Sequence, residues 1–385
     1  MTPANGNKSP RIAWITGLKG LSCYGVFLHH LSLNLDMDTY YGTVPEGVTW
    51  LLSSTPLGVV INGNFFVFLF LTLSAYLIGN TFVNYDGPDL RSKIGTFCLK
   101  RYFRLMLPIL AYAVLRQTFV LLCRLFGSCP LNPYPSWKFV IKHALYDVFA
   151  YDDTALAGPL WMMNHLFAGS YIALLLSLPD RKKCKPGMLL IDCIAFCFMI
   201  KSCLYFQASA IFGVLLVDLQ PLLQKISQRK HCRWIFAVLI IGGLLLGGVP
   251  STIVPFPFFL YRSVLPHSPT LHLLAAFLLL LGILGEYALS ENYPLKPSPV
   301  IRMLQATPLK FLGKISYSMF LVHESVLVLL FGSLRKLCEN QYHLPITATS
   351  VICIALLSPA AILISWLFYR FVEQSTTKLC DYIRF

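Results

Sequence analysis

Long apolar stretches separated by short polar segments dominate this sequence. A helix needs about 20 mostly apolar residues to cross a bilayer, so these stretches predict membrane-spanning helices. We expect an all-α polytopic membrane protein with about ten transmembrane helices, in a single domain over residues 1–385. The ten stretches lie near residues 12–34, 57–80, 103–125, 160–178, 187–204, 207–223, 234–250, 271–289, 309–331 and 347–370.

The composition agrees with this pattern. Hydrophobic residues make up 56% of the chain and charged residues only 12%, about half the charged share of a typical soluble domain. So few charges cannot cover a soluble globule of this size, and most of the chain must contact lipid or other membrane helices. The 31 Lys+Arg outnumber the 17 Asp+Glu, but they are divided among short loops rather than gathered in one basic domain. This distribution argues against nucleic-acid binding.

The basic loops orient the predicted helices, because Lys and Arg concentrate in cytosolic loops. Ten crossings with both ends in the cytosol place the basic clusters on one side, and only Arg335-Lys336 disagrees. We therefore predict cytosolic tails at residues 1–11 and 371–385, in an endoplasmic reticulum or other endomembrane protein. The clusters that agree include residues 91–104, 181–185, 225–233 and 296–314.

Two stretches do not fit a simple span. Residues 138–156 contain Lys142, His143 and three aspartates, too polar for a lipid-facing helix, and predict a lumenal or re-entrant segment. Residues 251–270 carry four prolines, which favours a broken or interfacial segment.

The first apolar stretch carries ionisable side chains, which are costly in a membrane and mark functional candidates. Lys19 and His30 are 11 residues apart. On a helix this spacing is about three turns plus 20°, so both project from one face, about 16 Å apart along the axis. His29 lies about 100° away from His30. In the structural alternative, Lys19 snorkels to the headgroups and His30 makes one interhelical hydrogen bond.

A second group of candidates is Lys100, Arg101 and Arg104, just before Pro108 at the expected start of the third span. Such a cluster is commonly a topological anchor. It also suits phosphate binding, because the guanidinium fork matches phosphate oxygens.

A third group is Ser316-Tyr317-Ser318 followed by His323 in the ninth stretch. A lone histidine in a membrane interior is more often structural than catalytic. The chain has no GxSxG elbow, Walker loop or HExxH motif, which leaves hydrolase, nucleotidase and zinc-protease functions without support. The cysteines show no metal-binding spacing, so we expect no metal and no permanently bound cofactor.

Six segments form an ordered series along the chain. They are RIAWITGLKGLSCYGVFLHH (11–30), NFFVFLFLTLSAYLIG (64–79), KRYFRLMLP (100–108), GPLWMMNHLFAGS (158–170), ISYSMFLVHESVL (315–327) and FVEQ (371–374). The series resembles the motifs of the acyltransferase-3 family of integral membrane acyltransferases, in its fungal form. In this resemblance Lys19 and His30 occupy the places of a basic residue and a histidine separated by ten residues. The resemblance covers nearly the whole chain and implies the same ten-helix architecture.

The sequence departs from the family pattern at three positions. Lys19 stands where the family usually has Arg, which keeps the charge but loses the bidentate fork. Thr16 stands where an acidic residue is common. Leu166, five residues after Trp161, stands where the family often has Glu, and the neighbouring His165 points off another helix face.

The resemblance implies an O-acyltransferase that moves an acyl group, expected to be acetyl, from acyl-CoA to a hydroxyl. The acceptor expected is a lipophilic small molecule, such as a fungal specialised metabolite of the terpenoid or polyketide class. His30 is the expected general base, because His titrates near neutral pH. Lys19, Arg101 and Arg104 are expected to bind acyl-CoA, and support for the substrate or the structure is expected from Ser316, Tyr317, His323 and Glu373.

The alternative hypothesis is a non-catalytic membrane transporter of a small metabolite that shares the fold. It is motivated by Leu166 in place of Glu and by the proline-rich stretch at 251–270.

Overall fold

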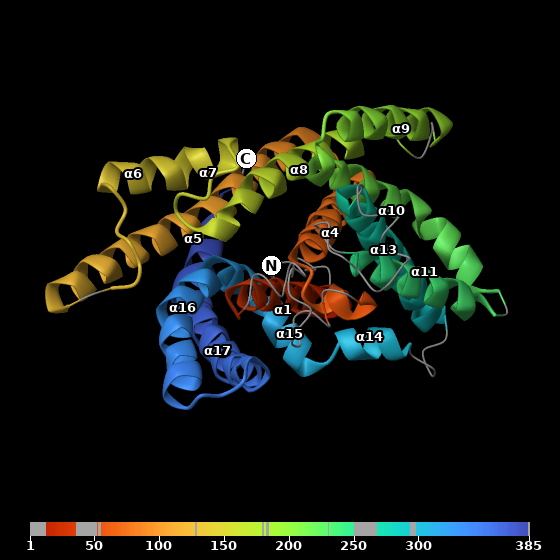
Figure 1. Ribbon diagram of the computed structural model, residues 1–385. Helices are drawn as coiled ribbons and strands as arrows, with labels where there is room; N and C mark the ends of the chain where they lie inside the picture. The colour runs from red at the N-terminus through yellow and green to blue at the C-terminus, as the bar shows by residue number, and fades with distance from the viewer. Residues whose placement is uncertain are drawn as a thin grey trace, which may run out of the picture.

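The computed structural model describes residues 13–35, 52, 55–127, 129–178, 181, 185–229, 231–249, 268–292 and 298–383. These residues form helices and turns, and no strand occurs among them (Figure 1). The prediction of an all-α membrane protein is therefore confirmed.

Helix α1 (Ala13–Leu35) lies between two groups of packed helices, as Figure 1 shows. Its Cys23 and Phe27 belong to one buried cluster, whereas Trp14 and Val26 belong to another. The first cluster includes residues of α5 (Leu90–Phe126), α8 (Met162–Ser177), α16 (Ser316–Lys336) and α17 (Ile346–Phe368). The second includes residues of α4 (Gly63–Val83), α10 (Tyr205–Ser227), α11 (Cys232–Gly247) and α13 (Ser268–Asn292).

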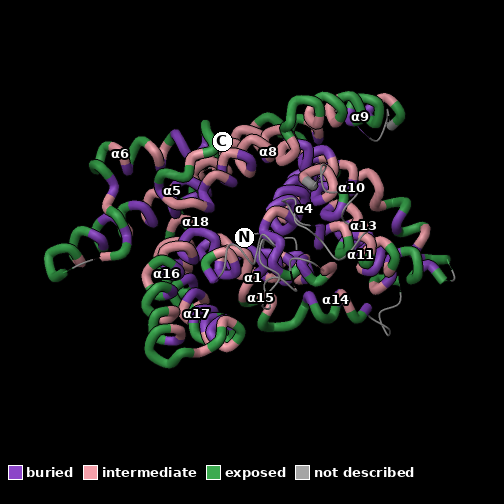
Figure 2. The backbone as a smooth tube through the Cα atoms, in the orientation of Figure 1, coloured by how far each residue is buried: buried purple, intermediate pink, exposed green. Residues whose placement is uncertain are grey.

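Helix α4 is the most enclosed of these helices. Its sequence is apolar on all sides, as expected for a helix surrounded by other helices. It packs against α1, α8, α10 and α13, and Figure 2 shows it as buried along most of its length. The side chain of Asn62 caps its first turn by accepting the backbone N–H of Phe65 at 3.2 Å.

Among the described residues, seven helices are long and apolar enough to span a membrane. Three further stretches from the predicted ten are also helical but shorter or more polar. Helix α1 carries Lys19, His29 and His30, while α9 (Lys185–Lys201) and α11 have 17 and 16 residues. The exact number of ten spans stays a prediction. The seven helices are Gly63–Val83, Leu90–Phe126, Gly158–Ser177, Tyr205–Ser227, Pro269–Asn292, Ser316–Gln341 and Ile346–Asp381.

Helix boundaries differ from those expected at three stretches. The stretch at 57–80 divides into the 3-10 turn η1 (Pro56–Val60) and α4, which begins at Gly63. Helix α5 begins at Leu90 rather than near residue 103 and continues through Pro108, so the basic cluster at 100–104 lies inside the helix. The stretch at 309–331 divides into α15 (Thr307–Lys314) and α16, which begins at Ser316.

Helix α15 crosses α1 at very close range, which small residues make possible. A Cβ atom on Gly313 would lie 1.7 Å from the carbonyl oxygen of Thr16. A Cβ on Gly20 would lie 2.4 Å from the carbonyl oxygen of Leu309, and one on Gly17 would meet Leu304 of α14 (Pro299–Leu304) at 1.7 Å. Larger side chains at these positions would push the helices apart. Lys19 projects from this same part of α1.

A buried ion-pair network fixes α9 to the rest of the fold. The guanidinium of Arg181 pairs with Asp192 of α9 and Asp218 of α10, and the side chains of Arg181 and Asp192 are 1% and 3% exposed. Arg181 Nε donates to Asp218 Oδ2 at 2.9 Å.

The polar stretch at 138–156 forms three short helical turns between α5 and α8. They are α6 (Trp137–Lys142), the π-helical turn η2 (His143–Asp147) and α7 (Val148–Ala150). The Tyr102 hydroxyl of α5 donates to the carbonyl of Leu145 at 2.8 Å, so this segment folds back along α5. Whether it is lumenal or re-entrant stays a prediction. Most of the proline-rich stretch at 251–270 lies outside the described residues.

Candidate active site

The imidazoles of His30 and His323 lie next to each other where α1 and α16 pack together. Their ring centroids are 5.1 Å apart and the rings are tilted by 48°. His30 is partly exposed, and its ring makes no hydrogen bond to any residue that the structure describes. Among the described residues, packing alone positions the ring.

His323 is held in a defined orientation. It is 1% exposed, and its Nδ1 lies 2.9 Å from the carbonyl oxygen of Met319 and 3.0 Å from that of Phe320. Carbonyl oxygens only accept, so Nδ1 carries the proton. The other nitrogen, Nε2, is buried and has no hydrogen-bond partner in the described part of the chain. Nε2 of His323 therefore keeps a lone pair that accepts no hydrogen bond from the described residues.

His29 has a different environment from His30, although its ring is only 5.2 Å away. Its Nδ1 donates to the carbonyl of Ile61 at 3.0 Å, just before α4. Its ring packs on Gly63, where a Cβ atom would lie 2.4 Å from His29 Cδ2. His29 thus joins α1 to the start of α4.

The start of α16 is fixed by three side chains. Ser316 and Tyr317 belong to its first turn, and Glu373 reaches it from beyond α17. The Ser316 hydroxyl donates to the carbonyl of Gly313 at 3.0 Å, and the Tyr317 hydroxyl donates to the carbonyl of Leu105 at 2.7 Å. Glu373 Oε2 accepts the hydroxyl of Ser318 at 2.6 Å and its backbone N–H at 3.2 Å. A carboxylate at this end satisfies first-turn N–H groups and complements the helix dipole.

The predicted donor-binding residues occupy different environments. Arg101 donates from Nε to Ser170 at 2.9 Å and from Nη2 to Ser74 at 3.0 Å, so α5 is bound to α8 and α4. Arg104 is exposed, and Lys19 is partly buried. Two serine hydroxyls thus fix the Arg101 guanidinium, and the Arg104 charge remains accessible.

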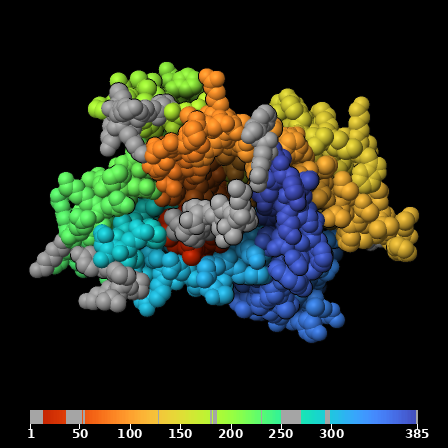
Figure 3. Space-filling view, turned by 180° about the vertical axis from the view of Figure 1, so that it is seen from behind, coloured from red at the N-terminus to blue at the C-terminus, as the bar shows by residue number. Residues whose placement is uncertain are grey.

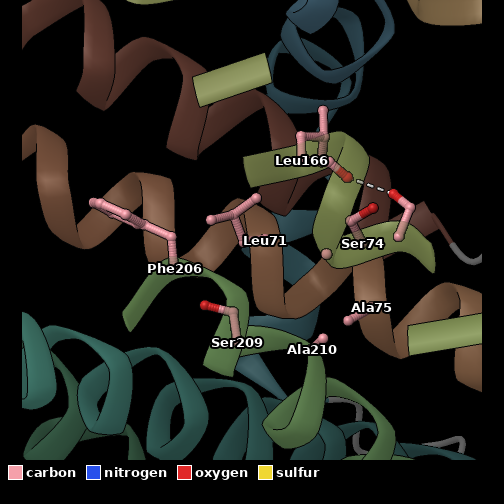
Figure 4. Close-up of a pocket in the computed structure, with 9 residues that line it drawn as sticks. Leu71, Ser74, Ala75, Leu166, Phe206, Ser209 and Ala210 are labelled. Carbon is pink, nitrogen blue, oxygen red and sulfur yellow. Dashed lines mark hydrogen bonds between the residues drawn. The ribbon is translucent and has the colours of Figure 1, made fainter. Parts of the chain in front are cut away.

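A small pocket lies beside the Arg101 contacts, with an empty volume of about 190 Å³ that includes its opening. Figure 4 shows Leu166 and Ser74 on its wall, with Phe206 and Ser209 across from them. Leu166, at the position where a Glu was expected from the family pattern, contributes an apolar side chain here. His165 faces elsewhere, since its Nδ1 lies 2.9 Å from Gln207 and its Nε2 lies 3.3 Å from Asp152.

Glu324 is a polar residue that the sequence interpretation passed over. Its Oε2 accepts the backbone N–H of Gly158 at 2.7 Å, at the start of the turn η3 (Gly158–Trp161). A Cβ on Gly158 would lie 2.5 Å from Glu324 Oε1, so a larger residue at this position would displace the Glu324 carboxyl group. The sequence did contain a signal for Glu324, because an ionisable residue inside a predicted span marks a functional candidate.

The surface is hollowed on the face seen in Figure 3, with α4 and α5 in orange above the hollow. Helix α1 appears in red at its floor, and the C-terminal helices appear in blue beside it. The helix that carries Lys19 and His30 is thus visible from outside between these elements.

Comparison of the chain with known protein families identifies the family to which it belongs. The family model for the acyltransferase domain matches residues 12–370, nearly the whole chain. The protein therefore belongs to the acyltransferase-3 family, and the resemblance seen in the sequence is confirmed. Comparison with the curated proteins and with the solved structures found no match.

Proposed function

We propose that the protein is a membrane-bound O-acyltransferase that moves an acyl group, in the first place acetyl, from acyl-CoA to a hydroxyl. The acceptor is a lipophilic small molecule, with specialised metabolites of the terpenoid or polyketide class as the first candidates. Family membership supports acyl transfer, and the helical membrane fold supports a lipophilic acceptor.

The observation that carries the proposal is the state of His30. Its imidazole is partly exposed, unbonded within the described residues, and 5.1 Å from His323 by ring centroids. A general base needs a nitrogen that is within reach of substrate and not occupied by the protein. His29 fails this requirement at Nδ1, which is bound to Ile61.

In the proposed reaction a neutral His30 nitrogen takes the proton of the acceptor hydroxyl as its oxygen attacks the thioester carbonyl. The C–O bond forms, the C–S bond breaks, and the departing CoA thiolate takes the proton from the His30 imidazolium. The buried His323 orients the His30 ring by packing against it.

Acyl-CoA enters this proposal as a co-substrate whose phosphates bind Lys19, Arg101 and Arg104. Lys19 precedes His30 by about 16 Å along α1, a distance that suits a long ligand with an anionic end and a reactive end. Arg101 is preoriented by Ser74 and Ser170, which lowers the entropy cost of holding its side chain.

The test uses membranes that contain the protein, labelled acetyl-CoA and a panel of lipophilic alcohols, with mass spectrometry of the products. We expect an acetylated alcohol and free CoA in equal amounts, and formation of both about 10²–10⁴-fold slower with His30→Ala membranes of matched protein content. Equal product formation by the variant would remove His30 from the mechanism.

A transport function is the second candidate, favoured by Leu166 in the pocket wall at the position where the family often has Glu. Sealed vesicles that contain the protein separate the two functions. Movement of an unmodified metabolite without acyl-CoA consumption would favour transport over acyl transfer.

A further inference from the structure

A second group of chemistry-bearing side chains lies away from the histidine pair, in the segment between α5 and α8. His143 and Asp147 stand at the two ends of the π-helical turn η2, and Asp153 follows α7. One nitrogen or oxygen atom from each of these three residues lies within 4.8 Å of the others. Single π-helical turns occur frequently at functional sites.

The three side chains converge on one point. His143 Nδ1 lies 3.3 Å from Asp147 Oδ2 and still closer to Asp153 Oδ2. Their side chains are 17%, 5% and 11% exposed. The ring of His143 packs on Phe139 at 3.9 Å between centroids, and Asp153 Oδ1 accepts the N–H of Ala155 at 2.8 Å. Phe139 thus fixes the His143 ring, and the N–H of Ala155 fixes the Asp153 carboxylate.

Only one oxygen of the buried Asp147 carboxylate, Oδ2, contacts another side chain among the described residues. The Oδ1 atom of Asp147 is buried without a hydrogen-bond partner among the described residues. A buried carboxylate oxygen that lacks a partner is costly. The nearest cation is Lys142, whose Nζ lies 2.9 Å from Oδ2, but the Lys142 side chain is 64% exposed. Lys142 can therefore leave this contact for solvent.

We propose that His143, Asp147 and Asp153 bind a divalent transition-metal ion of the Zn²⁺ or Mn²⁺ type. One imidazole nitrogen and two carboxylates suit these ions, whereas Ca²⁺ and Mg²⁺ prefer oxygen ligands alone. The two carboxylates also balance the charge of the ion. Bound there, the ion fixes the short turns that connect α5 to α8.

The test uses the purified full-length protein in detergent, stripped of metal with EDTA. Mn²⁺ binding is followed by electron paramagnetic resonance and Zn²⁺ binding by calorimetry. We expect one Mn²⁺ per chain displaced by Zn²⁺, which binds more tightly in the usual order of divalent ions. Excess Ca²⁺ should displace neither. Because binding is the readout, the result does not depend on acyltransferase activity.

Variants identify the ligands. Asp153→Asn should weaken Mn²⁺ binding by at least about 100-fold, the upper end of the loss seen even for outer-shell changes. Asp152→Asn is the matched control: this neighbouring carboxylate contacts His165 and Asn164 instead, so Mn²⁺ affinity should be unchanged. Lys142→Gln changes an exposed side chain and removes the ammonium that competes with the ion for Asp147 Oδ2. Mn²⁺ should therefore bind more tightly to this variant. Absence of saturable binding, or equal affinity in Asp153→Asn and the unaltered protein, would overturn the proposal.

Discussion

His30 and His323 come from opposite ends of the chain, yet their imidazole centroids are 5.1 Å apart. The two side chains are held differently. The His323 ring is fixed by the carbonyls of Met319 and Phe320, whereas the His30 ring has no hydrogen bond within the described residues. His323 is therefore the fixed member of the pair, and His30 is the member that the proposed mechanism uses as the base.

Replacing His30 with Ala should lower kcat by about 10²–10⁴-fold, the usual cost of losing positioned proton transfer. His29→Ala should instead lower stability by about 1 kcal/mol, since it removes the hydrogen bond to Ile61. Its folded fraction should keep most of its kcat. Turnover is measured per amount of protein in a monodisperse size-exclusion peak, and equal losses in both variants would contradict the assignment.

Lys19→Met should raise the KM for acyl-CoA more than it lowers kcat, because the proposed role of Lys19 is phosphate binding. Lys19→Arg should be close to neutral or better, since the guanidinium fork binds phosphate oxygens in two places. Steady-state kinetics with varied acyl-CoA decides the point. An unchanged KM with a collapsed kcat in Lys19→Met would exclude this role.

Gly313→Ala should destabilise the contact between α15 and α1, because the added Cβ would lie 1.7 Å from the carbonyl oxygen of Thr16. Overpacking of this kind costs about 1–3 kcal/mol. Thermal unfolding in detergent measures the loss. Gly332→Ala in α16 is the control, since its Cβ would meet no atom within 4 Å, and a comparable drop in Tm there would argue against the close crossing.

Asp192→Asn should destabilise the protein by about 3–5 kcal/mol, because it leaves the buried Arg181 charge only partly compensated. Asp218→Asn should cost less: the Asp218 side chain is 28% exposed, and Arg181 keeps Asp192 in that variant. The comparison uses Tm and the monodisperse fraction of the two proteins. The reverse order would mean that Asp218 is the main partner.

The orientation of the chain can be tested with glycosylation reporters. Both ends are expected in the cytosol and the loop around residues 36–46 in the lumen, because the basic clusters then share one side. A reporter in that loop should be modified and one at residues 226–232 should not. Modification of the second reporter alone would reverse the assigned orientation.

The sequence predicted the helical fold class, and the candidate site only in part. Apolar length identifies a helix, and periodicity places Lys19 and His30 on one of its faces. Neither indicates which helix will face that side, so the contact with His323 could not be foreseen. The start of α5 at Leu90 was missed because the basic residues between 91 and 101 interrupt the apolar pattern, although the helix includes them.

Other features depend on tertiary contacts that leave no local pattern. Nothing around Glu373 indicates that its carboxylate accepts hydrogen bonds from Ser318 of a different helix. The polarity of residues 138–156 was noted, but the meeting of His143 with Asp153 depends on how the chain turns after α7. Short-range spacing alone does not reveal such a group.

The cap that Glu373 places on α16 has a consequence for biosynthesis. A ribosome makes α16 before α17, and Glu373 follows both helices in the chain. The backbone N–H and the hydroxyl of Ser318 therefore have no Glu373 carboxylate to bind until the chain has been made past α17. His323 lies about two turns further along α16, so the histidine pair cannot form before α16 has been made. A nascent chain that has already inserted α1 carries His30 but not yet a settled site around it.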